Sequence, residues 1–121
     1  MAQPVVHFEI LGRDSKALQS YYSDLFGWSF ASAGLMGYAL TDPGRNAAGA
    51  GIPGGVGVMP EGYPGQVTIY VEVPDVEVAL SRAESLGGQR LMGPEKVMEG
   101  VEIGQFADPE GHVIGLLKAA F

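Results

Sequence analysis

The chain has 121 residues, a length typical of one compact domain. Because it contains no cysteine, a disulfide-stapled scaffold and a cysteine zinc site are both excluded. Its formal net charge of −7 argues against a nucleic-acid partner, which would require a basic surface. The sequence shows no apolar run of membrane-spanning length and no signal-peptide pattern at its start, so we expect a cytoplasmic protein that does not bind membranes.

The first half of the chain is predicted to form a strand, a helix and three further strands. Alternation over residues 5–11 predicts a strand with His7 and Glu9 on one face. Asp14 is suited to cap a helix whose apolar residues recur at three- and four-residue spacing up to Gly27. Strands are then expected to begin at Trp28, to cover residues 38–41, and to cover residues 50–58.

The second half predicts the same order of elements. Residues 66–73 form the clearest strand, and Asp75 follows it as the cap of a second helix. Ala79, Ala83 and Leu86 are expected to face inward from this helix. Three more strands are expected over residues 89–92, 100–107 and 112–117, with a turn at 108–111 between the last two.

The two halves also match residue by residue. The aligned pairs are His7 with Thr68, Glu9 with Tyr70, Asp14 with Asp75 and Gly27 with Gly88. Neither half has enough elements to cover one face of a sheet alone, so the two must pack together or with another subunit. We therefore expect a single domain over residues 1–121, built from two β-α-β-β-β modules at about 4–60 and 66–119.

This arrangement resembles the vicinal oxygen chelate superfamily, which includes glyoxalase I, bleomycin-resistance proteins and extradiol dioxygenases. The most specific matches are the helix end YSDLFGW at 22–28 and the closing stretch FADPEGHVIGL at 106–116. The resemblance implies an α+β fold in which the two modules form a curved mixed sheet around a pocket, with the helices outside. It leaves the function open, because this scaffold hosts lyases, isomerases, dioxygenases, transferases and binding proteins.

The resemblance also identifies the positions at which a metal site would have its ligands. Metal-dependent members hold a divalent ion with about three or four side chains, mostly His and Glu. Three of the corresponding positions are His7, Thr68 and Gly115, and residues 43–60, which contain the remaining one, include no Asp, Glu or His. His7 alone is a suitable ligand, and Glu9 on the same strand face does not complete a site. The sequence therefore predicts no metal and no cofactor.

Polar side chains are nevertheless expected in the pocket that the resemblance implies. We predict His7 and Glu9 as catalytic residues, because an imidazole and a carboxylate on one strand face can serve as general acid and base. The other predicted site residues are ligand-binding ones: Thr68, Tyr70, Trp28, Tyr38 and Val113. For the aromatic residues among them, packing within the sheet is the competing interpretation.

Three functions remain open. The first is a metal-free protein that binds a small molecule in the sheet cavity, as the resemblance to bleomycin-resistance proteins implies. The second is a lyase, isomerase or dioxygenase-type enzyme that acts on a small carbonyl or aromatic substrate. The third is a protein-interaction module with a vestigial pocket. In all three we expect a homodimer, since sheet edges in this architecture usually close against a partner.

Overall fold

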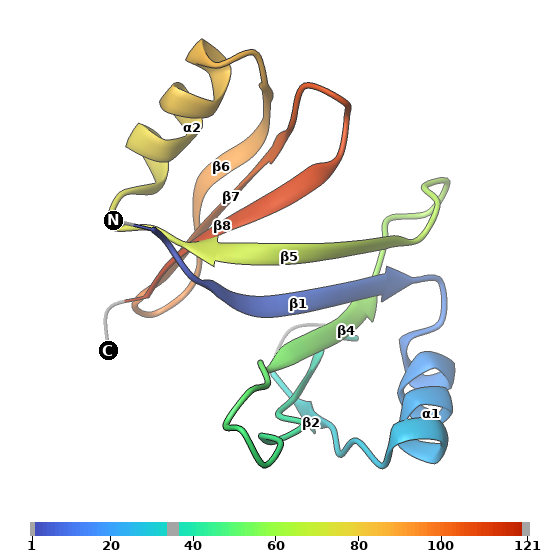
Figure 1. The fold of residues 1–121 in the computed structure, drawn as a ribbon. Helices are drawn as coiled ribbons and strands as arrows, with labels where there is room; N and C mark the ends of the chain where they lie inside the picture. Colours follow the sequence, from blue (N-terminus) through green and yellow to red (C-terminus); the bar gives the residue numbers. More distant parts are fainter. Residues whose placement is uncertain (1, 34–36, 120–121) are drawn as a thin grey trace. The chain divides into compact units, whose positions relative to one another are not determined.

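The computed structural model describes residues 2–33 and 37–119 (Figure 1). The chain divides into two compact units. The N-terminal unit covers His7–Val67, and the C-terminal unit comprises the described residues before and after that range.

In its described residues, the N-terminal unit contains one helix and four strands. Its elements are β1 (Val5–Gly12), α1 (Ser15–Phe26), β2 (Ala31–Ser32), β3 (Ala39–Thr41) and β4 (Gly54–Val58), with β1 starting just before the unit. The strand order is β2-β3-β4-β1. Strand β4 runs parallel to β1, whereas β2 with β3 and β3 with β4 pair antiparallel (Figure 1).

The C-terminal unit has the same organisation. Its elements are β5 (Gln66–Glu72), α2 (Val76–Ser85), β6 (Gln89–Met98), β7 (Val101–Ala107) and β8 (Val113–Ala119), with β5 starting just before Thr68. The strand order is β5-β8-β7-β6, with β8 parallel to β5 and the other pairs antiparallel (Figure 1). Both units therefore have the predicted β-α-β-β-β topology, and the mixed strand pairing and two helices confirm the α+β class.

Each helix begins at the aspartate that the sequence indicated. The Asp14 carboxylate accepts a hydrogen bond from the Ala17 amide at 3.0 Å, and Asp75 accepts one from Val78 at 2.9 Å. These bonds satisfy amides in the first turn that have no partner within the helix. Gly27 ends α1 with a φ of 74°, a left-handed conformation that glycine adopts without strain. Neither α1 nor α2, with 12 and 10 residues, has the length and apolarity of a membrane-spanning helix.

The strand boundaries differ from the prediction most at β2, β4 and β6. Strand β4 begins at Gly54, four residues after its expected start at residue 50. Strand β2 begins at Ala31, because Trp28 packs with other aromatic side chains before the strand starts. Strand β6 continues to Met98, six residues beyond its expected end at Met92. Register shifts against β7 accommodate the extension, so an irregular polar segment still pairs with its neighbour.

The core of the C-terminal unit lies between α2 and its sheet. Val76 and Leu80 are fully buried, and Val73 and Leu116 pack with them. Gly104 on β7 permits the close approach of the helix, because a Cβ there would lie 2.8 Å from Val76 Cγ1. The predicted inward face was partly wrong: Ala79 and Ala83 are half-buried, but Leu86 is 64% exposed. Leu80, at i+4 from Val76, takes the central position instead.

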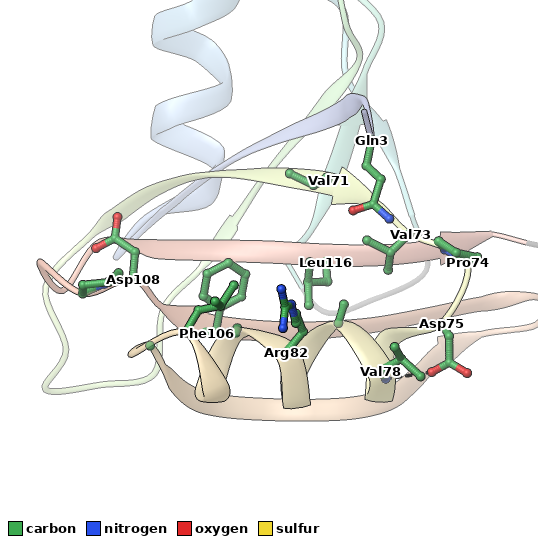
Figure 2. Close-up of a pocket in the computed structure, with 15 residues that line it drawn as sticks. Gln3, Val71, Val73, Pro74, Asp75, Val78, Arg82, Phe106, Asp108 and Leu116 are labelled. Atoms are coloured by element: carbon green, nitrogen blue, oxygen red, sulfur yellow. Dashed lines mark hydrogen bonds between the residues drawn. The ribbon is translucent and has the colours of Figure 1, made fainter. Parts of the chain in front are cut away.

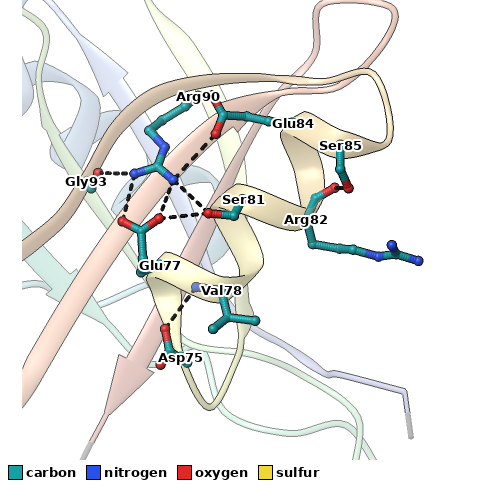
Figure 3. Close-up of polar contacts among 9 residues, drawn as sticks. All are labelled: Asp75, Glu77, Val78, Ser81, Arg82, Glu84, Ser85, Arg90 and Gly93. Carbon is teal, nitrogen blue, oxygen red and sulfur yellow. Dashed lines mark hydrogen bonds and ion pairs between the residues drawn. The ribbon is translucent and has the colours of Figure 1, made fainter.

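An ion-pair network joins α2 to β6 on the other side of the helix (Figure 3). The Arg90 guanidinium donates to both carboxylate oxygens of Glu77, at 2.9 and 2.6 Å, and lies 3.5 Å from Glu84. The hydrogen bonds from Arg90 are the main cause that lowers the pKa of Glu77 to about 2. Glu77 therefore keeps its negative charge at pH values well below neutral.

Truncation of Leu80 tests this core. We expect Leu80→Ala to lower the free energy of unfolding by about 2–5 kcal/mol, because it removes a buried side chain and leaves a cavity. The same substitution at Leu25, which is 56% exposed, serves as the control and should cost less than about 1 kcal/mol. Denaturant unfolding measures both. Equal losses for the two variants would contradict the assigned core.

Candidate functional site

Three polar side chains of the N-terminal unit meet at the Tyr38 hydroxyl. His7 and Glu9 project from the same face of β1, and Tyr38 immediately precedes β3. The Tyr38 hydroxyl donates to Glu9 Oε2 at 3.0 Å and lies 3.0 Å from His7 Nε2. Glu9 is 9% exposed, so its carboxylate depends on partners such as this hydroxyl. We call these three residues the Tyr38 cluster.

The protonation state of the cluster follows from its hydrogen bonds. A tyrosine hydroxyl has one hydrogen, and here it is directed to the Glu9 carboxylate. The Tyr38 oxygen can then only accept from His7, which assigns the remaining hydrogen to His7 Nε2. Burial lowers the pKa of His7 below its ordinary value of 6.5. The imidazole of the cluster is therefore neutral at pH 7.

Glycines on β4 determine where the Tyr38 ring lies. Gly55 pairs with Glu9 in the parallel register, and a Cβ at Gly55 would lie 2.2 Å from the Tyr38 oxygen. A Cβ at Gly57 would lie 2.6 Å from the same ring. No side chain can occupy either position while the ring stays in place. The strand expected over residues 50–58 is thus present over Gly54–Val58, and Tyr38 rests on its glycines.

The C-terminal unit also has a tyrosine ring that packs on a strand glycine. Tyr70 pairs with Gly115 on β8, and a Cβ at Gly115 would lie 2.4 Å from the Tyr70 ring. The Tyr70 hydroxyl accepts a hydrogen bond from Gln105 Nε2 at 2.8 Å. The Thr68 hydroxyl donates to the backbone carbonyl of Val113. Three predicted ligand-binding residues, Thr68, Tyr70 and Val113, therefore lie close together within this unit.

Trp28 lies apart from the Tyr38 cluster. Its ring packs against Phe8, Tyr22, Phe26 and Phe30, with ring-centre distances between 5.1 and 6.4 Å. Phe8 alternates along β1 with His7 and Glu9, so this aromatic cluster occupies the opposite face of the strand. The structure therefore does not bring Trp28 to the predicted catalytic pair, and its ligand-binding role stays a prediction.

Two functional contributions had no sequence signal that pointed to them. Gln105 is a neutral residue inside β7, and nothing in the local pattern marks it as the partner of Tyr70. Gly55 lies in the strand expected over residues 50–58, but nothing in the sequence marked it as the position on which Tyr38 rests.

The comparisons with known proteins agree with this architecture. A family model described as a glyoxalase-like domain matches residues 7–117. The chain belongs to the glyoxalase-like domain family. This result confirms the resemblance to the vicinal oxygen chelate superfamily that the sequence motifs indicated.

Curated relatives of this glyoxalase-like domain are longer than the chain itself. The glyoxylase-named protein CFP32 of Mycobacterium bovis is 29% identical over 112 residues. The anthracycline biosynthesis protein DnrV of Streptomyces peucetius is 28% identical over 117 residues. These matches cover 88% and 86% of this chain but 42% of each relative, so the chain spans less than half of their length.

Solved structures share the fold of the glyoxalase-like domain. A Streptomyces coelicolor methylmalonyl-CoA epimerase variant, in complex with 2-nitronate-propionyl-CoA, aligns over 100% of both chains with a TM-score of 0.71 and 16% identity. The epimerase from Mycobacterium tuberculosis aligns over 97% of this chain and 88% of its own, with a TM-score of 0.66 and 17% identity. At these identities the likeness shows the fold alone.

The residues of this glyoxalase-like domain do not fit the metal that the superfamily implies. The residues that the structure describes include no group of three or more His, Asp or Glu side chains that could hold an ion. Gly115 stands at one expected ligand position, and the Tyr70 ring fills the space that a side chain there would need. Gly55, which pairs with Glu9 as Gly115 pairs with Tyr70, is covered by Tyr38 in the same way.

The tautomer and pKa of His7 test the Tyr38 cluster. We expect nitrogen NMR to show His7 as a neutral imidazole with its hydrogen on Nε2 at pH 7. We also expect the His7 imidazole to titrate below pH 6.5, because burial disfavours its cation.

Two variants test whether the Tyr38 hydroxyl determines the tautomer of His7. Tyr38→Phe removes the acceptor of the Nε2 hydrogen, and Gly55→Ala pushes the same ring away, so both should shift the Nε2 resonance in the same direction. His112, which is exposed and paired with Asp108, provides the internal reference. An unchanged His7 resonance in Gly55→Ala would show that the ring does not rest on that glycine.

Proposed function

We propose that this glyoxalase-like domain binds a small molecule at the Tyr38 cluster and does so without a metal. The observation that carries the proposal is the Tyr38 hydroxyl, which joins a 9% exposed carboxylate to a neutral imidazole. Burying a carboxylate in this way costs free energy that a purely structural sheet would avoid. Such groups are therefore concentrated at sites where a ligand is recognised.

The chemistry of the cluster favours a ligand that carries a carbonyl with a hydroxyl or an acidic C–H beside it. A carboxylate accepts hydrogen bonds or protons, and a phenol and an Nε2–H imidazole donate hydrogen bonds. The epimerases with the same fold were solved with acyl-CoA compounds, which contain such a carbonyl, and two relatives are named for anthracycline biosynthesis. These names support small carbonyl and aromatic compounds as the first ligands to test.

The remaining predicted residues have less direct support. The Thr68 hydroxyl already donates to the Val113 carbonyl, so these two residues suit the wall of a site more than a polar contact with a ligand. Tyr70 and Trp28 keep their predicted ligand-binding roles. The homodimer and the cytoplasmic location also stay predictions.

An enzymatic function is the second candidate, and the position of Glu9 favours it. In a lyase or isomerase, the Glu9 carboxylate would take the proton from a carbon beside the substrate carbonyl. The electron pair of that C–H bond would move onto the carbonyl oxygen and form an enolate, which a proton returned from Glu9 would then neutralise. The Tyr38 hydroxyl at 3.0 Å, already oriented toward Glu9, would fix the carboxylate for this transfer.

A ligand panel tests the proposal. We expect one compound among methylmalonyl-CoA, an anthracycline and bleomycin to raise the melting temperature of the wild-type protein. A ligand present at a hundred times its Kd stabilises a protein by about 2.7 kcal/mol, enough to shift the melting temperature by several degrees. Glu9→Gln and Tyr38→Phe should lower the affinity for that compound by about tenfold or more, because the first removes the negative charge of the acceptor and the second removes the donor hydroxyl.

The control is Glu61→Gln, the same substitution at an exposed position between β4 and β5. It should leave the affinity unchanged. Binding that survives Glu9→Gln would remove Glu9 from the site. Failure of every compound to bind would overturn the proposal and favour the protein-interaction module. Turnover of a bound carbonyl compound that is lost in Glu9→Gln would establish the enzymatic candidate.

A further inference from the structure

A groove lies beside α2, wholly within the C-terminal unit (Figure 2). It has a volume of about 520 Å³. One wall is a single face of α2 that includes Val78, Arg82 and Leu86, and the other is formed by sheet residues such as Val73 and Leu116. We call it the α2 groove. It contains no residue of the Tyr38 cluster, so what it binds is independent of the proposed function.

The outer wall of the α2 groove is apolar and exposed. Val78 and Leu86 are each 64% exposed, although both are large aliphatic side chains. The sheet residues behind them, Val73 and Leu116, are almost fully buried. An aliphatic helix face left this open is typical of a surface that another protein covers.

The two arginines on and beside α2 differ in their ion partners. Arg90 binds Glu77 and Glu84 on the opposite side of α2, and the Arg82 side chain points away from that network (Figure 3). Arg82 forms no ion pair with any residue in the described part of the chain. Asp75 caps α2 at one end of the groove. The groove thus presents a carboxylate and a guanidinium on one helix.

The spacing of these two charges is self-complementary. Asp75 and Arg82 lie seven positions apart, which is about two helical turns, and Val78 and Ala79 occupy the midpoint. If a second α2 lies antiparallel across a two-fold axis at Val78, each Arg82 faces the Asp75 of the other copy. The same operation places the two exposed valines against each other. Such pairing is typical of a two-fold symmetric dimer: if Arg82 of one copy contacts Asp75 of the other, Asp75 of the first copy contacts Arg82 of the second.

We propose that the α2 groove is the contact surface for a second copy of this chain, with the two α2 helices antiparallel and centred on Val78. The contact buries Val78 and gives Arg82 an ion partner. The inference gives the expected homodimer a definite surface, which is a helix face and not a sheet edge.

A small anionic ligand fits the α2 groove less well. Arg82 would attract its charge, but Asp75 and Asp108, which also line the groove, would repel it. With Val78 and Leu86 exposed at the mouth, an apolar ligand would also remain largely in water. A second copy centred on Val78 covers that side chain and brings a carboxylate to Arg82.

Sedimentation equilibrium of the full chain tests the proposal. We expect a monomer–dimer equilibrium in the wild type, and Val78→Glu and Arg82→Glu should each weaken it by about tenfold or more. The first places a carboxylate at the centre of the contact, and the second sets it against the Asp75 of the partner. Val67→Glu is the matched control, since Val67 is 74% exposed and does not line the groove. Circular dichroism verifies that each variant is folded.

Cross-linking tests the orientation. The chain has no cysteine, so Val78→Cys introduces a single thiol at the proposed two-fold axis. Mild oxidation should convert this variant to a disulfide-linked dimer much faster than Val67→Cys. The proposal is overturned by a protein that is monomeric at all concentrations. A dimer that tolerates Val78→Glu and Arg82→Glu overturns it as well, as does equal cross-linking of the two cysteine variants.

Discussion

The contact between a tyrosine ring and a strand glycine is the constraint on which the candidate site depends. In each unit the ring occupies the space that a side chain on the last strand would need: Tyr38 over Gly55 and Tyr70 over Gly115. A methyl group at either glycine would overlap the ring, because the separations of 2.2 and 2.4 Å are far below a normal contact. The glycines therefore determine the position of each phenol, and the hydrogen bonds of the phenols follow from that position.

The same constraint accounts for the chemistry available in the N-terminal unit. Tyr38, once placed over β4, reaches both Glu9 and His7 at 3.0 Å. A hydrogen bond to a carboxylate contributes about 1.5–3 kcal/mol, more than one between neutral groups, so the buried Glu9 gains the most from it. His7, kept neutral by burial, remains a hydrogen-bond donor instead of becoming a cation. The cluster can thus bind polar groups or hold a proton with side chains alone.

The sequence was sufficient for the features that depend on neighbouring residues. Asp14, Asp75 and Gly27 are recognisable as helix ends because capping uses local hydrogen bonds. The repeat of elements was visible because both halves keep the same order. The inward face of α2 was partly wrong, since a short helix with apolar residues on two faces does not show which face meets the sheet. The position of Leu80 depends on Gly104 of a distant strand.

The candidate site was also predictable only in part, because some of its contacts join residues that are distant in the sequence. Alternation along β1 was enough to place His7 and Glu9 on one face. The pairing of Tyr38 with Gly55 depends on the register between β3 and β4 and between β4 and β1, which periodicity does not reveal. The link between Tyr70 and Gln105 crosses from β5 to β7 past an intervening strand. Trp28 illustrates the opposite case, because an aromatic residue at the end of a helix suits packing and ligand contact equally well.

The central claim is that tyrosine rings occupy the space that side chains at Gly55 and Gly115 would need, so that neither position can supply a metal ligand. Elemental analysis of protein purified without added metal tests it most directly. The account predicts a small fraction of an equivalent of zinc, nickel, manganese or iron after dialysis. Retention of about half an equivalent or more of any one of them would show that a metal is bound by residues that this account does not assign, and would contradict it.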